Sequence, residues 1–393
     1  MNATTFTGVR IWDGSGDAYL TDADAVRVED GRIAAVGLRA ALLAGSTERN
    51  LAGTTLVPGL IDAHVHLCLN PEIRNAAAQG QETDDELRAA MAARCAAMVR
   101  AGITTARDLG GGRWLELEIR DRIGDGELIG PRLLCSGQPI TSIKGHCHFW
   151  GGEAADLDAA MVVLARQVEK GADLIKVMAT GGNLTVGTDP AAAQFPVEVL
   201  VAIVSEARRR GLHVAAHCHG TPGIRAAAAA AVTTIEHCSW VGPAGWGVDY
   251  DAEVAADIAA RGIWVSPTIN AGWKRNIGRA DFEARVRENY QRMAAAGVRL
   301  IASTDAGIPN VWHHHLPQAL PVFSHFARLS PLATLRAATA HCAEAIGLGA
   351  VTGRVAVGFA ADLLFVEGDP LADLDALARP VLVVARGREI PAE

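Results

Sequence analysis

The chain has 393 residues, half of them hydrophobic and a fifth charged, and its formal net charge is −8. This composition is typical of a folded protein with a large interior and argues against disorder. The negative charge, with no basic stripe to offset it, argues against a nucleic-acid partner.

The ends and the cysteines indicate the compartment. The sequence contains no apolar run of about 18 residues, so we expect no membrane span and no membrane partner. The first residues lack a basic segment followed by an apolar one, so we expect no signal peptide. Seven cysteines are scattered without C-x-x-C spacing. They favour a reduced, cytoplasmic location with buried thiols.

Residues 1–55 have the pattern of short strands and turns. Asp30–Gly31 separates the strand-like stretches Ala25–Val28 and Ile33–Val36, which predicts a hairpin. Strand-like stretches return near the other end of the chain, at Arg354–Val357, Asp362–Val366 and Val381–Ala385. We therefore expect residues 1–55 and 349–393 to form one small β-sandwich domain, interrupted by a larger domain.

Between them, residues 56–348 alternate predicted strands with helices. The predicted strands are Leu56–His66, Ile103–Asp108, Arg132–Cys135, Asp173–Met178, Leu212–His217, Thr233–His237, Ile263–Pro267 and Val298–Asp305. The clearest helices are Asp84–Arg100, Asp156–Lys170, Val197–Arg210 and Asp281–Ala296. Eight strand–helix units predict an α/β fold, a (β/α)8 barrel of the TIM type, whose chemistry lies at the C-terminal strand ends. A doubly wound open sheet is the alternative, but it gathers ligands from its first and last strands less easily.

Two H-x-H pairs lie at predicted strand ends. His64 and His66 share one face because side chains at i and i+2 of a strand point the same way, and His217 and His219 repeat the spacing. Paired imidazoles are half of a site for a divalent metal. A single pair of this kind is more often packed or on a loop, so the other strand ends decide the interpretation.

Three further strands end in chemically useful residues, namely Lys176, His237 and Asp305. Burying an unpaired lysine is costly, so Lys176 either pairs with a carboxylate or serves chemistry, a Schiff base being one alternative. Any one of these residues alone is more often structural. Their arrival at one rim of a barrel, together with the histidine pairs, predicts metal binding.

The motifs have a specific order along the chain: VPGLIDAHVHL, TTARDLGG, IKVMATGG, VAAHCHG, TIEHC and STDAG, followed by the tail GRVAVGFAADLLFVEGDPL. Over essentially the whole chain they resemble the amidohydrolase superfamily. Within it, the sequence is most similar to the Xaa-Pro dipeptidase and imidazolonepropionase-related group.

The resemblance implies two divalent metal ions, with zinc as the expected metal. His64, His66 and Asp305 would hold one ion, and His217 and His237 the other. Lys176 would bridge them as a carbamate formed with carbon dioxide. Such a centre supplies hydroxide at neutral pH, and Asp305 would pass the proton to the leaving amine.

The sequence leaves several neighbouring positions open. Family pattern favours His217 over His219 as the ligand, which leaves His219 near the substrate. His146 is a candidate for polarising the carbonyl or meeting a carboxylate, and an exposed loop histidine is the alternative. Asp108 is expected to be structural. Two larger groups are candidates for the pocket: His313, His314 and His315, and Trp114, Trp150, Trp240, Trp246, Trp273 and Trp312.

These inferences predict a binuclear metal-dependent amidohydrolase that cleaves an amide bond of a small molecule, such as a dipeptide or an N-acyl amino acid. The alternative within hydrolases is a carbamate, urea, lactone or phosphotriester substrate at the same metals. A Schiff-base aldolase and a non-catalytic metal-stabilised scaffold are the rivals from other classes. A homo-oligomer is compatible with the sequence.

Overall fold

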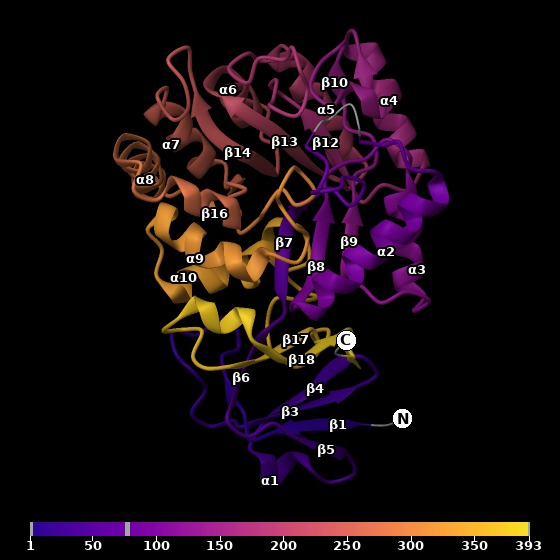
Figure 1. Cartoon of the computed structure of the whole chain (residues 1–393), viewed down its shortest axis with the longest axis vertical. Coiled ribbons are helices and arrows are strands. Elements are labelled where there is room, and N and C mark those ends of the chain that lie inside the picture. Colours follow the sequence, from indigo (N-terminus) through magenta and orange to yellow (C-terminus); the bar gives the residue numbers. More distant parts are fainter. Residues whose placement is uncertain (1–2, 75–78, 392–393) are drawn as a thin grey trace.

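The computed structural model describes residues 3–74 and 79–391. Figure 1 shows two parts, an upper one with helices around strands and a lower one of strands. Both chain ends, indigo and yellow, lie in or beside the lower part. None of the helices in the described ranges combines the length and the apolar character needed to cross a bilayer.

The lower part contains two sheets. The first has the order β4-β3-β1-β5, from β1 (Thr4–Thr7), β3 (Ala25–Glu29), β4 (Arg32–Gly37) and β5 (Thr47–Asn50). The second has the order β19-β18-β17-β6-β2, from β2 (Arg10–Ile11), β6 (Thr54–Pro58), β17 (Leu363–Glu367), β18 (Pro380–Ala385) and β19 (Arg388–Glu389). The hairpin at Asp30–Gly31 is confirmed, since β3 and β4 pair antiparallel and both turn residues have positive φ. The predicted strand Arg354–Val357 was wrong, because that stretch is a loop.

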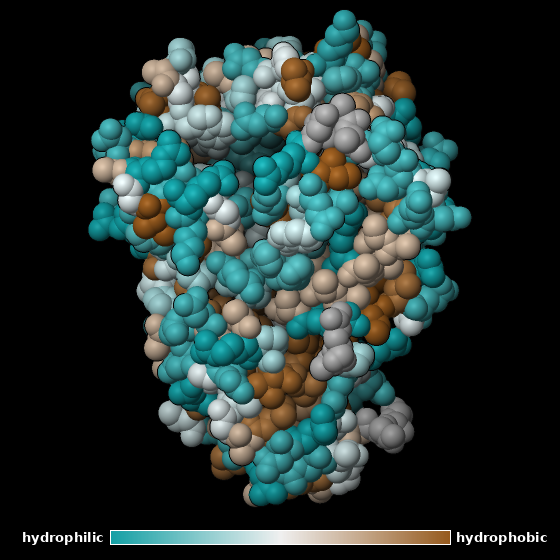
Figure 2. Space-filling view, in the orientation of Figure 1, coloured by the Kyte–Doolittle hydropathy of each residue, from teal (hydrophilic) through white to brown (hydrophobic). Residues whose placement is uncertain are grey.

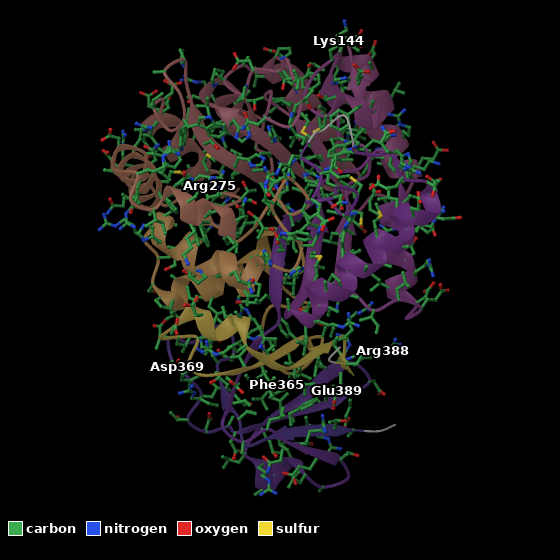
Figure 3. All side chains as sticks on the ribbon, viewed as in Figure 1. Lys144, Arg275, Phe365, Asp369, Arg388 and Glu389 are labelled. Carbon is green, nitrogen blue, oxygen red and sulfur yellow. The ribbon has the colours of Figure 1, made fainter. Side chains whose placement is uncertain are left out.

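An apolar core joins the two sheets. The rings of Phe6, from the first sheet, and Phe365, from the second, lie 5.1 Å apart, and Phe365 is labelled in Figure 3. Val26 and Leu363 belong to the same buried cluster. The first and last segments of the chain thus share one core.

The predicted strand Leu56–His66 is two strands. Residues of β6 pair antiparallel with β17 in the lower part, whereas β7 (Leu60–Val65) pairs parallel with β8 in the upper part. Gly59 separates them, and a Cβ built there would lie 2.1 Å from Oγ1 of Thr104. A glycine therefore permits the close approach at which the chain passes from one sheet to the other.

The upper part contains two parallel sheets. One has the order β7-β8-β9, with β8 (Ile103–Asp108) and β9 (Arg132–Cys135). The other has the order β12-β13-β14-β15-β16, from β12 (Leu174–Met178), β13 (His213–Gly220), β14 (Thr234–Val241), β15 (Trp264–Ser266) and β16 (Arg299–Leu300). A short pair, β10 (Thr141–Ser142) and β11 (Glu153–Ala154), lies apart. The predicted α/β class with parallel strands is confirmed.

Backbone contacts link the two parallel sheets at both edges. The amide of Ile140 donates to the carbonyl of Lys176 at 2.9 Å, next to the β9–β12 edge. On the other side, the amide of Ala63 donates to the carbonyl of Ala302 at 3.3 Å, and the amide of Asp305 to the carbonyl of His64 at 2.9 Å.

Helices surround these strands in Figure 1. Their bounds are α2 (Asp84–Arg100), α3 (Leu115–Gly124), α4 (Leu157–Glu169), α5 (Val197–Arg209), α6 (Thr221–Ala229), α7 (Ala252–Ala260), α8 (Ala280–Ala295), α9 (Leu316–Ala327), α10 (Pro331–Ala337) and α11 (Ala340–Ala345), with α1 (Arg39–Leu42) in the lower part. The shorter 3-10 helices are η2 (His148–Trp150), η3 (Ala271–Asn276) and η4 (Leu374–Ala378). The four predicted helices agree within one residue at each end. A capping box at Thr83 and Glu86 fixes the start of α2.

Candidate metal centre

One site gathers side chains from the C-terminal ends of the parallel strands. His64 is the second-last residue of strand β7, His66 directly follows that strand, and Lys176 lies on β12. The same end of the upper part receives His217 and His219 from β13, His237 from β14 and Asp305 from the loop after β16. All but Asp305 are buried.

The first pair of histidines is held with matching tautomers. Nδ1 of His64 donates to Oε2 of Glu236 at 3.0 Å, and Nδ1 of His66 donates to the carbonyl of Gly110 at 2.9 Å. Because both acceptors lack protons, each Nε2 keeps its lone pair. The two Nε2 atoms are 3.3 Å apart, and Oδ1 of Asp305 lies 3.3 and 3.4 Å from them. Three ligand atoms therefore converge on one point.

A second convergence lies on the neighbouring strands. Nε2 of His217 donates to the carbonyl of Gly181 at 3.1 Å, which leaves Nδ1 free to bind. Nε2 of His237 lies 2.9 Å from that Nδ1, and Nδ1 of His237 contacts Oγ1 of Thr268 at 2.7 Å. His237 and Asp305 both have positive φ, at 67° and 60°. Backbone strain of this kind is typical of functional sites.

Lys176 lies between these groups and is only 1% exposed. Its Nζ has no hydrogen-bond partner among the described residues. Burial lowers the pKa of this amine to about 8, against the opposing effects of Glu236 and Asp305. A buried amine without a partner is costly, so the position calls for a function or a ligand.

His219 and His146 lie beside these residues. The ring of His219 stacks on that of His237 at 4.4 Å, and the ring of His146 lies 4.5 Å from that of His217. Burial lowers the pKa of both His219 and His146 to about 3, which keeps the rings neutral. A Cβ at Gly182 would lie 2.6 Å from the His146 ring, so this glycine makes room for it. His217, His219 and His237 form one metal-capable group and His64, His237 and Asp305 another, each with ligand atoms within 4.8 Å.

Three other candidates, Asp108, His313 and Trp150, contact the segment that contains His66. Asp108 accepts from the amides of Leu67 and Gly110 at 2.7 and 2.9 Å, so its predicted structural role is confirmed. His313 is buried and its Nε2 donates to the carbonyl of His66 at 3.0 Å. Trp150 packs its ring 5.2 Å from that of His66.

Sequence reasoning missed a buried ion pair beneath the site. The guanidinium of Arg107 donates to Oε1 of Glu236 at 2.8 Å and to the carbonyl of Ala63 at 2.7 Å. Burial alone would raise the pKa of Glu236, but Arg107 and His64 hold it well below its usual range. Two predicted buried strands each contain a charged residue, Arg107 in one and Glu236 in the other. Buried charges are seldom left unpaired, so the sequence could have indicated this ion pair.

Asp62 was also missed. Its Oδ1 accepts from the amides of His64 and Thr304 at 3.2 and 3.1 Å, and its Oδ2 accepts from the Thr304 hydroxyl at 2.5 Å. This carboxylate ties the strand of His64 to the loop that carries Asp305.

The site faces a cavity of about 710 Å³. This volume lies within the range of small-molecule sites. Figure 2 shows a hollow in the upper half of the molecule, surrounded mostly by hydrophilic side chains. Trp246 and Trp273 line the cavity, as do the cations Arg74, Arg275 and Arg279.

The fold and the site define a hydrolase of the amidohydrolase family, to which the chain belongs: the model of that family matches residues 55–390. The resemblance inferred from the motifs is therefore confirmed. Enzymes of this family depend on metal and act on C–N bonds, and the chain is a hydrolase of that class. Buried imidazoles with free nitrogens, one carboxylate and a lysine that has no partner in the described part of the chain fit such a metal site.

Individual relatives agree with this assignment. Ochratoxinase of Aspergillus niger is 29% identical over 376 residues, covering 86% of this chain and 75% of that protein. Imidazolonepropionase of Mycolicibacterium smegmatis is 26% identical over 376 residues, covering 87% and 84%. The crystal structure of A. niger ochratoxinase matches with a TM-score of 0.85 at 26% identity, covering 99% and 95%. A Xaa-Pro dipeptidase with bound methionine shares the fold, with a TM-score of 0.86 at 23% identity and 99% coverage of both chains.

Proposed function

We propose that this protein is a binuclear metal-dependent amidohydrolase that cleaves an amide bond of a small molecule, such as a dipeptide or an N-acyl amino acid. One observation carries the proposal. Imidazole nitrogens from three strands and the Asp305 carboxylate converge beside Lys176, whose Nζ has no partner among the described residues. The relatives include ochratoxinase and imidazolonepropionase, which supports a C–N bond as the target.

The donor set suits two divalent ions. His64, His66 and Asp305 would hold one ion, and His217 and His237 the other. Imidazole and carboxylate donors fit zinc. When bound, the ions polarise the scissile carbonyl and lower the pKa of water.

Lys176 would join the two halves of the centre as a carbamate. The neutral amine attacks the carbon of carbon dioxide and loses one proton, which leaves an anion with two oxygens. The burial that lowers the pKa of Lys176 to about 8 favours the neutral amine that this step needs. Carboxylation would also remove the cost of burying an unpaired cation.

Asp305 would transfer the proton, and His146 and His219 would contact the substrate. The Asp305 carboxylate lies 3.3 Å from Nε2 of His64 and would accept the proton of the attacking water. It would deliver that proton to the leaving amine nitrogen. The neutral rings of His146 and His219 would donate an N–H to the carbonyl oxygen or to a substrate carboxylate.

We also propose that the parallel strands close into one (β/α)8 barrel. The backbone hydrogen bonds at both edges of the two sheets, from Ile140 to Lys176 and from Ala63 to Ala302, support this closure. Residues 1–55 and 349–393 would then be the small β-sandwich domain, and residues 56–348 the barrel.

A hydrolysis screen tests the proposed reaction. The enzyme, supplied with zinc and bicarbonate, is offered dipeptides and N-acyl amino acids beside carbamates, lactones and phosphotriesters. We expect release of free amino acid from a subset, and loss of that activity in Asp305→Asn. Turnover confined to the esters, carbamates or lactones would overturn the amide assignment.

The carbamate has its own test. Lys176→Ala should lose metal and activity together, and a short carboxylic acid should restore part of both by filling the vacated space with an anion. Full activity of Lys176→Ala without an added acid would contradict the bridge.

A further inference from the structure

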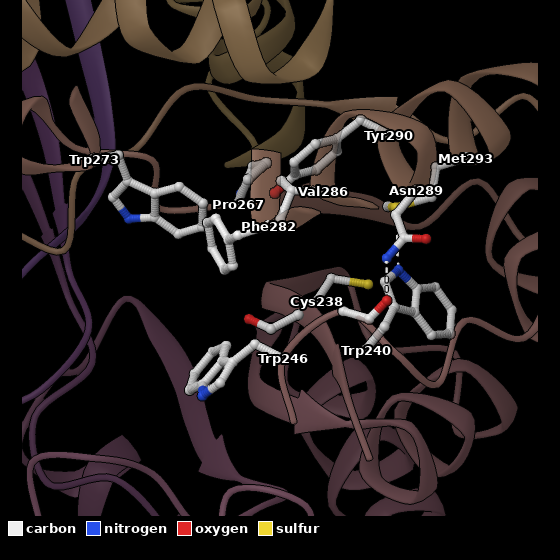
Figure 4. Close-up of a pocket in the computed structure, with 12 residues that line it drawn as sticks. Cys238, Trp240, Trp246, Pro267, Trp273, Phe282, Val286, Asn289, Tyr290 and Met293 are labelled. Atoms are coloured by element: carbon white, nitrogen blue, oxygen red, sulfur yellow. Dashed lines mark hydrogen bonds between the residues drawn. The ribbon is translucent and has the colours of Figure 1, made fainter. Parts of the chain in front are cut away.

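A small apolar compartment lies beside the metal centre. Its volume is about 30 Å³. Figure 4 shows Trp246, Trp273 and Phe282 around one side of this compartment, which we call the side pocket, and Cys238 and Val286 facing them. No charged side chain of the described residues lines it.

Two polar groups in the wall of the side pocket are already engaged. The Asn289 amide donates to the carbonyl of Gly247 at 2.9 Å, and Nε1 of Trp240 donates to the sulfur of Met293 at 3.3 Å, as the dashed lines in Figure 4 indicate. The wall therefore presents mainly carbon and sulfur to an occupant. An uncharged apolar group suits it, and a charged group would lose its hydration without compensation.

The side pocket adjoins the catalytic cavity. Pro267, Trp246, Trp273 and Phe282 line both spaces. The ring of Trp246 lies 4.7 Å from that of His219, which is part of the candidate metal centre. A substrate bound at the metals can therefore extend one group into the side pocket.

The same segment of chain also provides positive charge. Arg275 lies on η3 (Figure 3), and Arg279 follows three residues after that helix, between Trp273 and Phe282 in sequence. The guanidinium of Arg279 lies 5.6 Å from the centroid of the Phe282 ring. Both arginines line the catalytic cavity, and neither forms an ion pair within the described part of the chain. Arg279 donates one hydrogen bond to Oδ1 of Asn276 at 2.9 Å.

We propose that the side pocket binds the apolar side chain of an α-amino acid whose carboxylate is held by Arg279 and Arg275. The substrate class is then an N-acylated α-amino acid, or a dipeptide with an apolar C-terminal residue, and the amide nitrogen of that amino acid is the leaving group. The carboxylate and the side chain leave the same Cα, so one segment, residues 273–282, can recognise both. This inference rests on the proposed amide hydrolysis. It adds that the protein recognises the amino-acid half of the substrate, whose nitrogen is the leaving group.

The size of the side pocket sets the preferred side chain. By this measure of volume one water molecule needs about 10–15 Å³. A space of about 30 Å³ therefore accommodates roughly two groups of that size. A branched aliphatic tip, as in leucine or valine, fits this space, whereas a phenyl ring needs the walls to move. We therefore expect leucine and valine to be preferred over alanine, and over phenylalanine.

The test compares N-acetyl-L-alanine, N-acetyl-L-leucine and N-acetyl-L-phenylalanine. We expect kcat/KM to be at least tenfold higher for the leucine compound than for the alanine compound, which is typical of added methylenes in a fitted pocket. Val286→Ala enlarges the side pocket and should shift the preference toward phenylalanine, while Val286→Phe fills it and should reduce the leucine-to-alanine ratio to near one. Val254→Ala is the matched control, because it removes the same atoms from a buried helical position outside the side pocket.

Binding provides a readout that does not need turnover. Calorimetric Kd values for the same three compounds, measured in the inactive Asp305→Asn background, should show the same order and the same shifts in the Val286 variants. If no amide is hydrolysed but these shifts occur, the side pocket stands and the proposed reaction fails. Hydrolysis or binding with side-chain ratios that the Val286 variants leave unchanged would overturn the side pocket.

The arginines are tested by removing the substrate charge. N-acetyl-L-leucinamide lacks the carboxylate, so it should bind at least tenfold more weakly than N-acetyl-L-leucine to the wild type. In Arg279→Met with Arg275→Met the two compounds should bind alike. Equal binding of the two compounds by the wild-type protein would contradict the carboxylate contact.

Discussion

The Glu236 carboxylate lies 3.0 Å from Nδ1 of His64, on the side of the ring away from the metal-facing nitrogen. This contact fixes the His64 tautomer and frees Nε2 for binding. Carboxylates that hold a ligating histidine in this way raise its basicity and its affinity for metal.

Glu236→Gln should therefore weaken metal binding. The amide keeps the shape of the side chain but removes its charge, and we expect a loss of zinc affinity of about 10- to 100-fold. Competition with a chromogenic chelator measures this affinity. Glu206→Gln, on α5 and remote from the site, is the control that should bind zinc as the wild type does. Unchanged affinity in Glu236→Gln would refute the role of the contact.

Arg107 should matter more for stability than for binding. Arg107→Met leaves the buried Glu236 charge uncompensated, which typically lowers the free energy of unfolding by about 3–5 kcal/mol. Denaturant unfolding of the metal-free protein measures the change. Arg354→Met breaks an exposed pair with Glu344 and should cost about 1 kcal/mol or less. If the free energy of unfolding falls by the same small amount in both variants, the buried pair is not a main source of stability.

Glu116 should make stability depend on pH. Both of its carboxylate oxygens are buried without a hydrogen-bond partner among residues 3–74 and 79–391, and burial, followed by the nearby Asp108, raises the pKa of this carboxyl to about 8. Between its unfolded value of 4.5 and about 8, the folded state holds a proton that the unfolded state has lost. The free energy of unfolding should therefore fall as pH rises through this window, by up to about 1.4 kcal/mol per pH unit.

Glu116→Gln removes that titration. Denaturant unfolding at a series of pH values between 4.5 and 9 should show a flatter profile than that of the wild type. Glu118→Gln, on the same helix but with a more exposed side chain, should keep the wild-type slope. A Glu116→Gln profile parallel to that of the wild type would show that the carboxyl titrates normally.

Gly182 should control the placement of His146. In Gly182→Ala the new Cβ would meet the His146 ring at 2.6 Å, so the ring must move. We expect kcat/KM to fall by about 100-fold while zinc content stays unchanged, because a displacement of about 1 Å in a positioned group can have this effect. Gly124→Ala is the control, since nothing lies within 4 Å of the added carbon. Activity that survives in Gly182→Ala would exclude His146 from the reaction.

The sequence predicted the structure correctly where the spacing of residues and their side-chain chemistry indicated the same feature. The H-x-H spacing predicted that His64 and His66 share a face, and the structure places their Nε2 atoms 3.3 Å apart. The predicted helices Asp84–Arg100 and Val197–Arg210 agree with α2 and α5 within one residue.

Other features depend on contacts between distant residues, which no local pattern encodes. Glu236 reaches His64 across 172 positions of the chain, and Arg107 reaches Glu236 across 129. The division of Leu56–His66 into β6 and β7 depends on β17, which lies near the other end of the chain. His313 was predicted only as a candidate for the pocket, and its contact with the carbonyl of His66 could not be predicted.

The single residue between β6 and β7 has a consequence for protein engineering. Because only Gly59 separates the strand that pairs with β17 from the strand that carries His64, the two parts have no linker at this junction. An exchange of the lower sheets between relatives would shift the first pair of imidazoles, so chimaeras of these enzymes should be joined at the loops that follow the strands, and β6 and β7 should be inherited together.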